Sequence, residues 1–264
     1  MSLYLSGLWR YPVKSCQPQS LDHAWVESRG LEGDRRYLVT DLDGQFITAR
    51  SFPRLVQLQA KPVADGLHLA AAGQPDLHLR VADFPQQYRP ITIWKQQLDA
   101  RHCGEQVDAW LTRFLGHPCQ LLYFDEQTQR PIKDQPDQQV SFADAYPLLL
   151  TSTASLDWLQ QHCPIPIQMQ QFRPNLVISG ADAWAEDGWQ RVRVGDITFA
   201  VHSPCERCKL ITLPPGSETF DTRQEPLRTL IRHHASATGK PLFGHNLIPL
   251  NEGRLQTGMP VEVW

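Results

Sequence analysis

The sequence predicts a β-rich α+β fold, and three features of its 264 residues carry that prediction. Short extended segments recur between Gly, Pro and Asp, and the 21 prolines and 16 glycines argue against a helical bundle. Helical periodicity is clear in one stretch and weaker in two others. With 41% hydrophobic residues, the chain can bury a sizeable core as two modest domains or one large β-rich domain.

Apolar, β-branched or aromatic runs predict the strands of the first part of the chain. These strands span residues 3–11, 24–27, 36–41, 45–49, 56–62, 77–81 and 91–94. Between the third and fourth lies DLDGQ, whose Asp-Gly pair is typical of a hairpin turn. The first part of the chain is therefore expected to be mostly sheet.

One helix is expected within GEQVDAWLTRFLGHP, where apolar residues recur at helical spacing until Gly116 and Pro118 end the element. Its apolar positions are Val107, Trp110, Leu111, Phe114 and Leu115. A second helix is expected after Ser152, through Leu156, Trp158 and Leu159.

A third helix is expected over residues 225–234, with Leu227, Leu230 and Ile231 on one face. The segments FRPNLVISG, VRVGDITFAVHSP and KLITLPPG read as strands. The tail GRLQTGMPVEVW reads as a hairpin whose Val261 and Val263 alternation would close a sheet or barrel.

Cysteine usage and the N-terminal segment predict a cytoplasmic protein. Residues 1–16 lack the basic and apolar regions of a secretory signal, and no apolar run approaches the roughly 18 residues of a membrane helix. Six cysteines in a chain of this length do not resemble a disulfide framework, so a reducing compartment would keep them as thiols.

The formal charge of −3 gives no global attraction to nucleic acid or to an acidic membrane, so neither is expected as a partner. An anion site must therefore be local. Lys14 and Ser15 in YPVKSC, Arg35 in GLEGDRRYLV and Arg173 in FRPNLV are candidates, although each has an ordinary reading as a solvated turn or a surface arginine. Strand alternation would send Arg35 and Arg36 to opposite faces.

The pair Cys205 and Cys208 in SPCERCKLIT is compatible with zinc, a redox disulfide, a small buried hydrophobe or coincidence. If a strand starts near Arg207, the offset of three residues sends the two thiols to opposite faces, which disfavours chelation or a disulfide. One cysteine would then be the working thiol. Arg207 and Lys209 would point away from Cys208.

Several segments, in order along the chain, together resemble the MOSC family, named for the C-terminal domain of molybdenum cofactor sulfurase. These segments are YPVKSC, GLEGDRRYLV with ITARSFPRLVQL, SFADAYPLLLTSTASL, FRPNLVISG, CERCKLIT, and GKPLFGHN with LQTGMPVEVW. The resemblance is greatest to the branch that includes the mitochondrial amidoxime-reducing component and bacterial reductases of N-hydroxylated compounds. It implies a MOSC β-barrel with a few peripheral helices in residues 119–264, and a smaller N-terminal β-barrel-like domain in residues 1–118.

The resemblance also implies roles for individual residues. Cys208 matches the catalytic cysteine that ligates the molybdenum of a pterin cofactor, whereas Cys205 has no such role by analogy. Lys14, Ser15 and Arg35 match positions that hold the phosphate of this cofactor.

Three further residues are implied to bind the cofactor. Arg173 matches an arginine that contacts the pterin, and Asn175 lies in the same motif. Asp144 aligns with a cofactor-contacting acid, but Ala145 and Tyr146 depart from the small hydroxyl pair expected after it.

These residue types suit such a cofactor. A molybdopterin presents soft sulfur at the metal and a phosphate at its far end. A thiolate suits the metal, whereas arginine, lysine and a serine hydroxyl suit the phosphate oxygens. His202 and His245 are conceivable proton donors, although a structural role is at least as common for such residues.

The resemblance implies a molybdenum cofactor-dependent oxidoreductase that reduces N–O bonds in small N-hydroxylated substrates. The sequence lacks the four-cysteine pattern of an appended 2Fe–2S domain, so electrons are expected from a separate protein of the ferredoxin, flavoprotein or cytochrome type. Two other readings stay open. One is a molybdenum cofactor carrier or sulfur-handling accessory protein without turnover, and the other is a zinc or structural protein in which the two cysteines are incidental.

Overall fold

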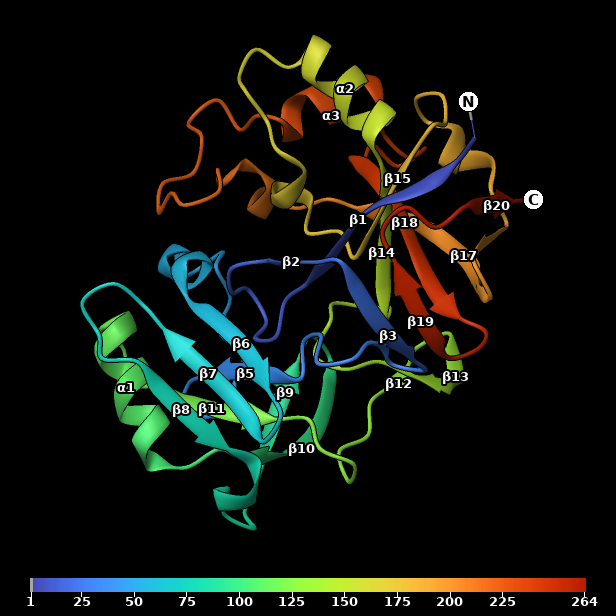
Figure 1. The fold of residues 1–264 in the computed structure, drawn as a ribbon. Coiled ribbons are helices and arrows are strands. Elements are labelled where there is room, and N and C mark those ends of the chain that lie inside the picture. Colours follow the sequence, from blue (N-terminus) through green and yellow to red (C-terminus); the bar gives the residue numbers. More distant parts are fainter. Residues whose placement is uncertain (1) are drawn as a thin grey trace. The chain divides into compact units, whose positions relative to one another are not determined.

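The computed structural model describes residues 2–264, which form two compact units. Unit 1 contains the described part of Met1–Arg10 together with Ser20–Glu32 and Tyr146–Trp264, and unit 2 contains Tyr11–Gln19 and Gly33–Ala145. The structure confirms the β-rich α+β class, because strands dominate both units (Figure 1). The domain boundary expected after residue 118 stays a prediction.

Unit 1 is built on an eight-stranded sheet with the order β2-β1-β15-β14-β18-β17-β16-β20. The strands are β1 (Tyr4–Arg10), β2 (Gln19–Leu21), β14 (Leu148–Ser152), β15 (Leu176–Ser179), β16 (Arg191–Val194), β17 (Ile197–Glu206), β18 (Leu242–Pro249) and β20 (Val261–Val263). From β1 to β20, neighbouring strands pair antiparallel except β14 and β15, which run parallel.

Backbone hydrogen bonds join the segment around β20, at one edge of this sheet, to the segment around β1. Leu5 N donates to Met259 O at 2.9 Å, and Val261 N donates to Leu3 O at 3.0 Å. A second sheet of unit 1 contains β3 (His23–Glu27), β4 (Gly30–Leu31) and β19 (Gly253–Gln256). The return of the chain end to β1 is consistent with the expected barrel, since closure removes a free sheet edge.

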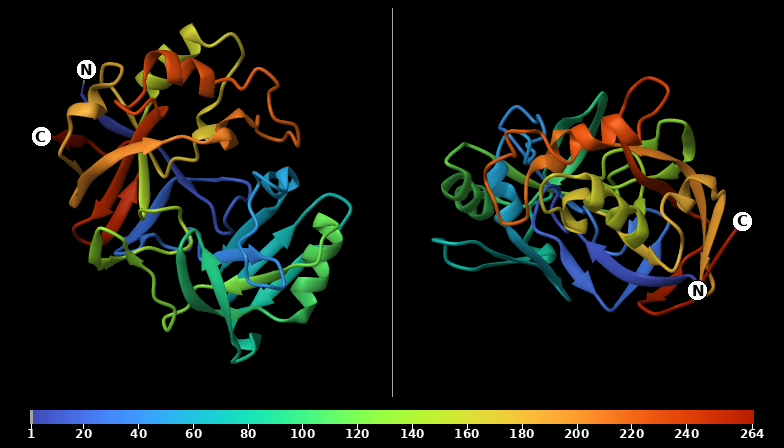
Figure 2. Two further views of the ribbon diagram at one scale, coloured as in Figure 1. Left: turned by 180° about the vertical axis from the view of Figure 1, so that it is seen from behind. Right: turned by 90° about the horizontal axis from the view of Figure 1, so that it is seen from above.

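Two helices lie side by side in unit 1 (Figure 2). They are α2 (Thr153–His162) and α3 (Leu227–His233), and Ser152 caps α2 by accepting from Ser155 N at 3.4 Å. Buried Leu159, Phe172, Leu230 and Phe243 form a common apolar cluster beneath them. Three 3₁₀ helices complete the unit: η3 (Met169–Phe172), η4 (Ala185–Gly188) and η5 (Lys209–Thr212).

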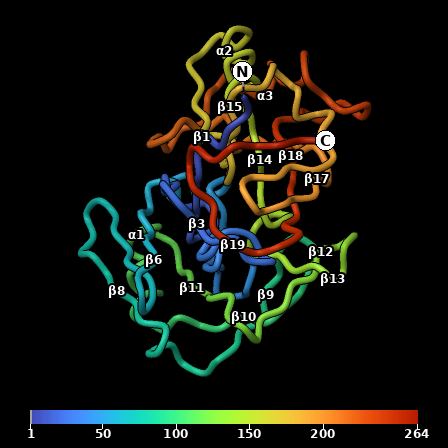
Figure 3. The backbone as a smooth tube through the Cα atoms, turned by 45° about the vertical axis from the view of Figure 1, so that its right-hand side comes forward, coloured from blue at the N-terminus to red at the C-terminus, as the bar shows by residue number. Residues whose placement is uncertain are grey.

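Unit 2 contains a four-stranded sheet, a three-stranded sheet and a two-stranded hairpin. The first has the order β5 (Tyr37–Thr40), β11 (Gln120–Tyr123), β10 (Gln96–His102) and β9 (Tyr88–Ile93). The second contains β6 (Gln59–Val63), β7 (Gly66–Ala70) and β8 (Leu77–Arg80), and the hairpin contains β12 (Pro131–Ile132) and β13 (Gln135–Gln139) (Figure 3). Short 3₁₀ helices occur at η1 (Pro53–Gln57) and η2 (Val81–Asp83).

The expected amphipathic helix is confirmed as α1 (Glu105–Leu115), and its buried residues are four of the five apolar positions. Gly116 ends it in the left-handed conformation with φ 66°, and its N–H donates to Thr112 O at 2.8 Å. The other two helices are also confirmed, but Ile231 of α3 is 47% exposed and does not share the buried face.

Three strand predictions are wrong. Residues 45–49 form no strand and take part only in two isolated bridges, Phe46 with Thr40 and Gln45 with Thr92. Residues 209–212 form η5 instead of a strand. The tail is no hairpin, because β19 pairs with β3 whereas β20 pairs with β16.

Candidate functional site

In unit 2, the predicted anion-binding residues surround a buried lysine. The Lys14 side chain is 8% exposed, and its Nζ donates to Phe142 O at 2.8 Å and to Asp144 Oδ1 at 2.6 Å. The Lys14 backbone N–H donates to Tyr37 O at 2.9 Å, so strand β5 fixes the residue from which the side chain extends. The structure therefore brings Lys14 and Asp144 together.

Burial and charge together set the protonation of this pair. Burial lowers the pKa of Lys14 to about 8, because Asp144 only partly offsets the desolvation and the neighbouring Arg130 and Arg35 add repulsion. For Asp144, desolvation acts to raise the pKa, but Lys14, Arg35 and Arg50 together hold the pKa well below its usual range. The pair is thus ionised at neutral pH.

The segment 141–144 turns successive backbone carbonyls toward two cations. Arg130 Nη1 donates to Ser141 O at 2.8 Å and to Ala143 O at 2.5 Å, and its Nη2 donates to Asp144 O at 2.8 Å. The carbonyl left over, that of Phe142, accepts from Lys14. Arg130 is 2% exposed, so these contacts define the path of the segment in the interior.

Arg35 lies next to this segment, in the left-handed backbone region with φ 48°. Its Nη1 donates to Asp34 Oδ2 at 2.5 Å, and its guanidinium stacks 4.3 Å from the centre of the Tyr11 ring. Its backbone carbonyl accepts from Phe142 N at 3.0 Å. Ser15, which follows Lys14 in the sequence, also has a left-handed backbone with φ 72° and is 4% exposed.

The expectation that alternation would separate Arg35 and Arg36 is wrong, because β5 begins only at Tyr37. Both side chains are largely buried: that of Arg35 is 12% exposed and that of Arg36 is 9% exposed. Arg36 donates to Phe124 O at 2.9 Å and to Glu126 Oε1 at 3.1 Å.

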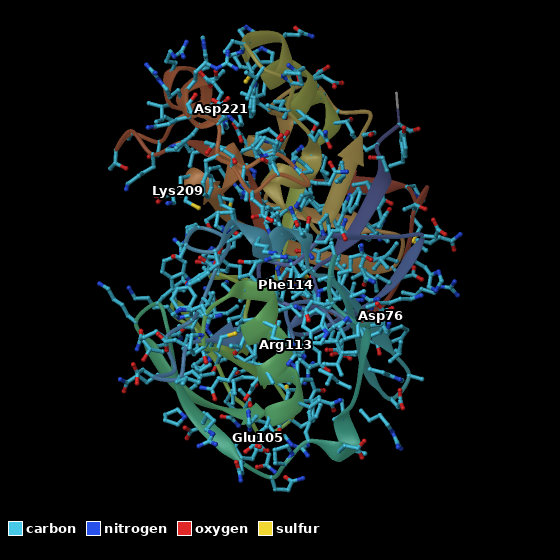
Figure 4. The ribbon with its side chains drawn as sticks, turned by 90° about the vertical axis from the view of Figure 1, so that its left-hand side faces the viewer. Asp76, Glu105, Arg113, Phe114, Lys209 and Asp221 are labelled. Carbon is cyan, nitrogen blue, oxygen red and sulfur yellow. The ribbon has the colours of Figure 1, made fainter. Side chains whose placement is uncertain are left out.

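In unit 1, the predicted metal ligand Cys208 has an exposed side chain. It immediately precedes η5, and its carbonyl accepts from Ile211 N at 3.2 Å. Figure 4 marks Lys209, the next residue, whose Nζ lies 5.1 Å from the centre of the Phe220 ring. Four of the other cysteines are buried and Cys205 is partly buried, so Cys208 presents the most accessible thiol.

The strand geometry expected for the two cysteines is wrong, because β17 ends at Glu206 and the chain then turns into η5. Cys205 lies within β17, where the pairing with β18 shifts register between Pro204 and Glu206. Arg207 Nη1 donates to Cys205 Sγ at 2.9 Å. The arginine therefore engages the other cysteine of the pair.

Arg207 also ties the Cys208 turn to the segment of Arg173. Its Nη2 donates to Phe172 O at 2.6 Å, and its backbone N–H donates to Pro241 O at 2.8 Å. Phe172 ends η3, and the following Arg173 is left-handed with φ 55° and is partly buried. Arg207 is a site-shaping residue that the sequence pattern did not identify as one.

Asn175 has a structural environment. It is 0% exposed, its Oδ1 accepts from Leu149 N at 3.2 Å, and its Nδ2 donates to Trp9 O at 3.1 Å. These contacts tie β14 to β1. Its assignment as a cofactor contact stays a prediction.

The two candidate proton donors differ in environment. His245 is 3% exposed, and burial lowers its pKa although Asp187, 3.6 Å away, acts in the opposite direction. His202 is partly buried, and its ring lies 4.5 Å from the ring of Tyr146. Neither environment assigns a catalytic role.

Within residues 2–264, no three His, Cys, Asp or Glu side chains cluster in a way that could hold a metal ion by themselves. The same residues include no helix that is both long and apolar enough to cross a bilayer.

Family models match most of the chain. The MOSC N-terminal beta barrel domain matches residues 2–118, and the MOSC domain matches residues 137–262. Human mitochondrial amidoxime-reducing component 1 is 34% identical over 97% of this chain and 82% of its own length. Human mitochondrial amidoxime reducing component 2 is 32% identical over the same shares. The YUAD protein from Bacillus subtilis, a solved structure, is 12% identical with a TM-score of 0.44, over 100% of this chain and 96% of that chain.

Proposed function

We propose, from the premise that this chain belongs to the MOSC family that includes the amidoxime-reducing components, that it is a molybdenum cofactor-dependent reductase of N-hydroxylated compounds. The observation that carries the proposal is the exposed thiol of Cys208, the residue that the sequence resemblance matches to a metal ligand. Its turn is fixed by Arg207 through a hydrogen bond to Phe172 O.

The residues present fit this cofactor chemically. Unit 1 offers one accessible sulfur, a soft ligand of the kind that suits molybdenum. Unit 2 offers a buried ammonium and a largely buried guanidinium, which are the donors that a phosphate requires. The local positive charge explains how a chain with a net charge of −3 would bind an anionic group.

Each residue then has a defined task. Cys208 would ligate the metal, and Lys14, Ser15 and Arg35 would hold the phosphate. Arg173 and Asn175 are proposed to contact the pterin part, and Asp144 is proposed to belong to the phosphate end of the site. When bound, the cofactor supplies the two-electron redox chemistry, while the protein positions it and limits water.

The proposed substrate is a small N-hydroxylated compound, such as an amidoxime, whose N–O bond is cleaved with two electrons and two protons. The electrons are proposed to come from a separate donor protein of the ferredoxin, flavoprotein or cytochrome type. The relatives named for amidoxime reduction support this substrate class.

The test is Cys208→Ser, with Cys205→Ser as the matched control. Both proteins would be expressed in a host that makes the molybdenum cofactor. We expect Cys208→Ser to lose reduction of an aryl amidoxime by at least about a hundredfold, since the replaced atom is the metal ligand, while its circular dichroism and melting temperature stay near those of the parent protein. Cys205→Ser should retain most of the activity.

Two other results would change the assignment. Full amidoxime reduction by Cys208→Ser would refute the metal-ligand role. Stoichiometric cofactor and molybdenum in the purified parent protein, without turnover of any N-hydroxylated compound under reducing conditions, would instead support a cofactor carrier or sulfur-handling accessory protein.

A further inference from the structure

We propose that Asp144 is a built-in counterion of Lys14, which an incoming phosphate displaces. This inference rests on the proposed phosphate role of Lys14. It differs from the role implied by the family resemblance, in which the acid contacts the cofactor.

The first observation is an asymmetry within the ion pair. The Lys14 side chain is 8% exposed, whereas that of Asp144 is 72% exposed, although the two atoms of the pair are only 2.6 Å apart. The cation is therefore built into the protein, and the anion approaches it from the solvent side. An exposed carboxylate regains its hydration when it leaves such a pair, so its displacement is easy.

The second observation is that only the Asp144 side chain needs to move. The Asp144 carbonyl accepts from Arg130 Nη2 at 2.8 Å, and the preceding carbonyl also accepts from Arg130, so the backbone stays fixed. Lys14 keeps its hydrogen bond to Phe142 O when the carboxylate leaves. A rotation of the Asp144 side chain would thus free the Lys14 ammonium, which is already oriented toward the solvent side of the site.

The third observation is the contrast with the second acid of the cluster. Asp34 is 2% exposed, and its Oδ1 accepts from Tyr11 N at 2.8 Å while its Oδ2 accepts from Arg35. This carboxylate is a fixed part of the interior. The cluster therefore has one permanent anion, Asp34, and one replaceable anion, Asp144.

Charge explains why a replaceable anion is useful. Lys14 is repelled by Arg130 and Arg35, and Asp144 is also attracted by Arg50. Without Asp144, the unliganded protein would hold Lys14 near other cations, and its ammonium would keep, among the described residues, the hydrogen bond to Phe142 O. Asp144 thus stabilises the empty site and competes with the ligand for the same ammonium.

This double role predicts effects of opposite sign for Asp144→Asn. We expect the variant without ligand to melt at a lower temperature than the parent protein, because the counterion is lost. We expect inorganic phosphate to bind about twofold to fivefold more tightly, which corresponds to removing one competing ion pair whose carboxylate is exposed. Calorimetry on the cofactor-free full chain at pH 7, and melting temperatures across a phosphate titration, would measure both effects.

The control is Asp76→Asn, which removes the same charge from a similarly exposed carboxylate. The Asp76 side chain is 67% exposed, and its Oδ2 lies 3.1 Å from His68 Nε2 (Figure 4). This variant should leave phosphate affinity unchanged. Lys14→Met should abolish phosphate binding both in the parent protein and in the Asp144→Asn variant.

Weaker phosphate binding by Asp144→Asn would show that the acid helps to hold the ligand and would overturn the inference, as would unchanged binding. If phosphate binds the parent protein through Lys14 but Asp144→Asn is no tighter, the inference fails while the anion site stands. If phosphate binds none of the proteins, the anion site of the proposed function fails as well.

Discussion

The buried ammonium of Lys14 combines two properties that depend on each other. The same burial that fixes its direction lowers its pKa to about 8, so the charge on which anion binding depends is lost within an accessible pH range. The groups that act on it are Asp144, Arg130 and Arg35. An arginine at this position would keep its charge at pH values at which Lys14 has lost its proton.

We therefore predict that phosphate affinity falls as the pH rises through about 8. The sign follows because Lys14 is protonated below this pH, and only the protonated amine attracts an anion. The decrease should approach about tenfold for each pH unit above the midpoint, until the pH also exceeds the higher pKa of the amine in the complex. Calorimetric titrations between pH 6.5 and 9.5 would measure it.

Lys14→Arg is the control for this prediction. The variant should lose the decrease near pH 8 even if its affinity is lower at neutral pH. A decrease of the same size in Lys14→Arg would assign the titration to another group.

At the scale of single residues, the sequence pointed to candidate ligand-binding side chains but not to the residues that hold their segments in place. Lys14, Arg35 and Cys208 lie in recognisable motifs, and the structure places Lys14 near Arg35 and exposes the thiol of Cys208, while their roles stay predictions. Arg130 and Arg207 were not identified because their main partners are backbone carbonyls of remote residues. Any residue type presents a carbonyl, so no sequence pattern marks such a partner.

Among the elements, segment 141–144 depends on Arg130. We expect Arg130→Met to lower the free energy of unfolding by about 3–5 kcal/mol, since the loss of the guanidinium leaves Ser141, Ala143 and Asp144 carbonyls without their partner. Urea unfolding would measure the change.

Arg113→Met is the matched control, because Arg113 is an exposed arginine of α1. Its effect should be within about 0.5 kcal/mol of zero, as is usual for surface substitutions. A similarly small effect for Arg130→Met would mean that segment 141–144 keeps its path without the guanidinium.

Sequence patterns predicted elements well where one periodicity prevailed. The helix α1 has a continuous apolar stripe and a glycine stop, and it formed as expected. The apolar run KLIT reads equally well as a strand, but Thr212 Oγ1 donates to Lys209 O at 2.8 Å and the segment winds into η5. The strand β10, which is rich in polar residues, was not predicted because its pattern is set by pairing with β9.

For the whole molecule, local patterns could not reveal which stretches assemble into a unit. Unit 1 joins residues of β1 and β3 to strands more than a hundred positions later. Contacts between strands that are distant in sequence depend on register and packing. Local composition carries no information about which distant strand a segment pairs with. The β-rich class was predictable because it depends on the sum of many short segments.

At the same scale, we predict that the purified protein with its cofactor reduces amidoximes only when an electron donor protein or an artificial reductant is added. Pyridine nucleotide alone should give no more than background turnover. The measurement is amidine formation with nicotinamide cofactor alone, and then with a reduced viologen dye as the positive control. Robust turnover with nicotinamide cofactor alone would contradict the proposed need for a separate donor.

The backbone hydrogen bonds that join β1 to residues 258–261 make the two extremities of the polypeptide mutually dependent. A protease that removes residues 258–264 would leave main-chain groups of Leu3 and Leu5 without hydrogen-bond partners. Strand β1 would then have unpaired backbone groups, which favour self-association. Proteolysis of the last residues would thus cause aggregation that starts at β1.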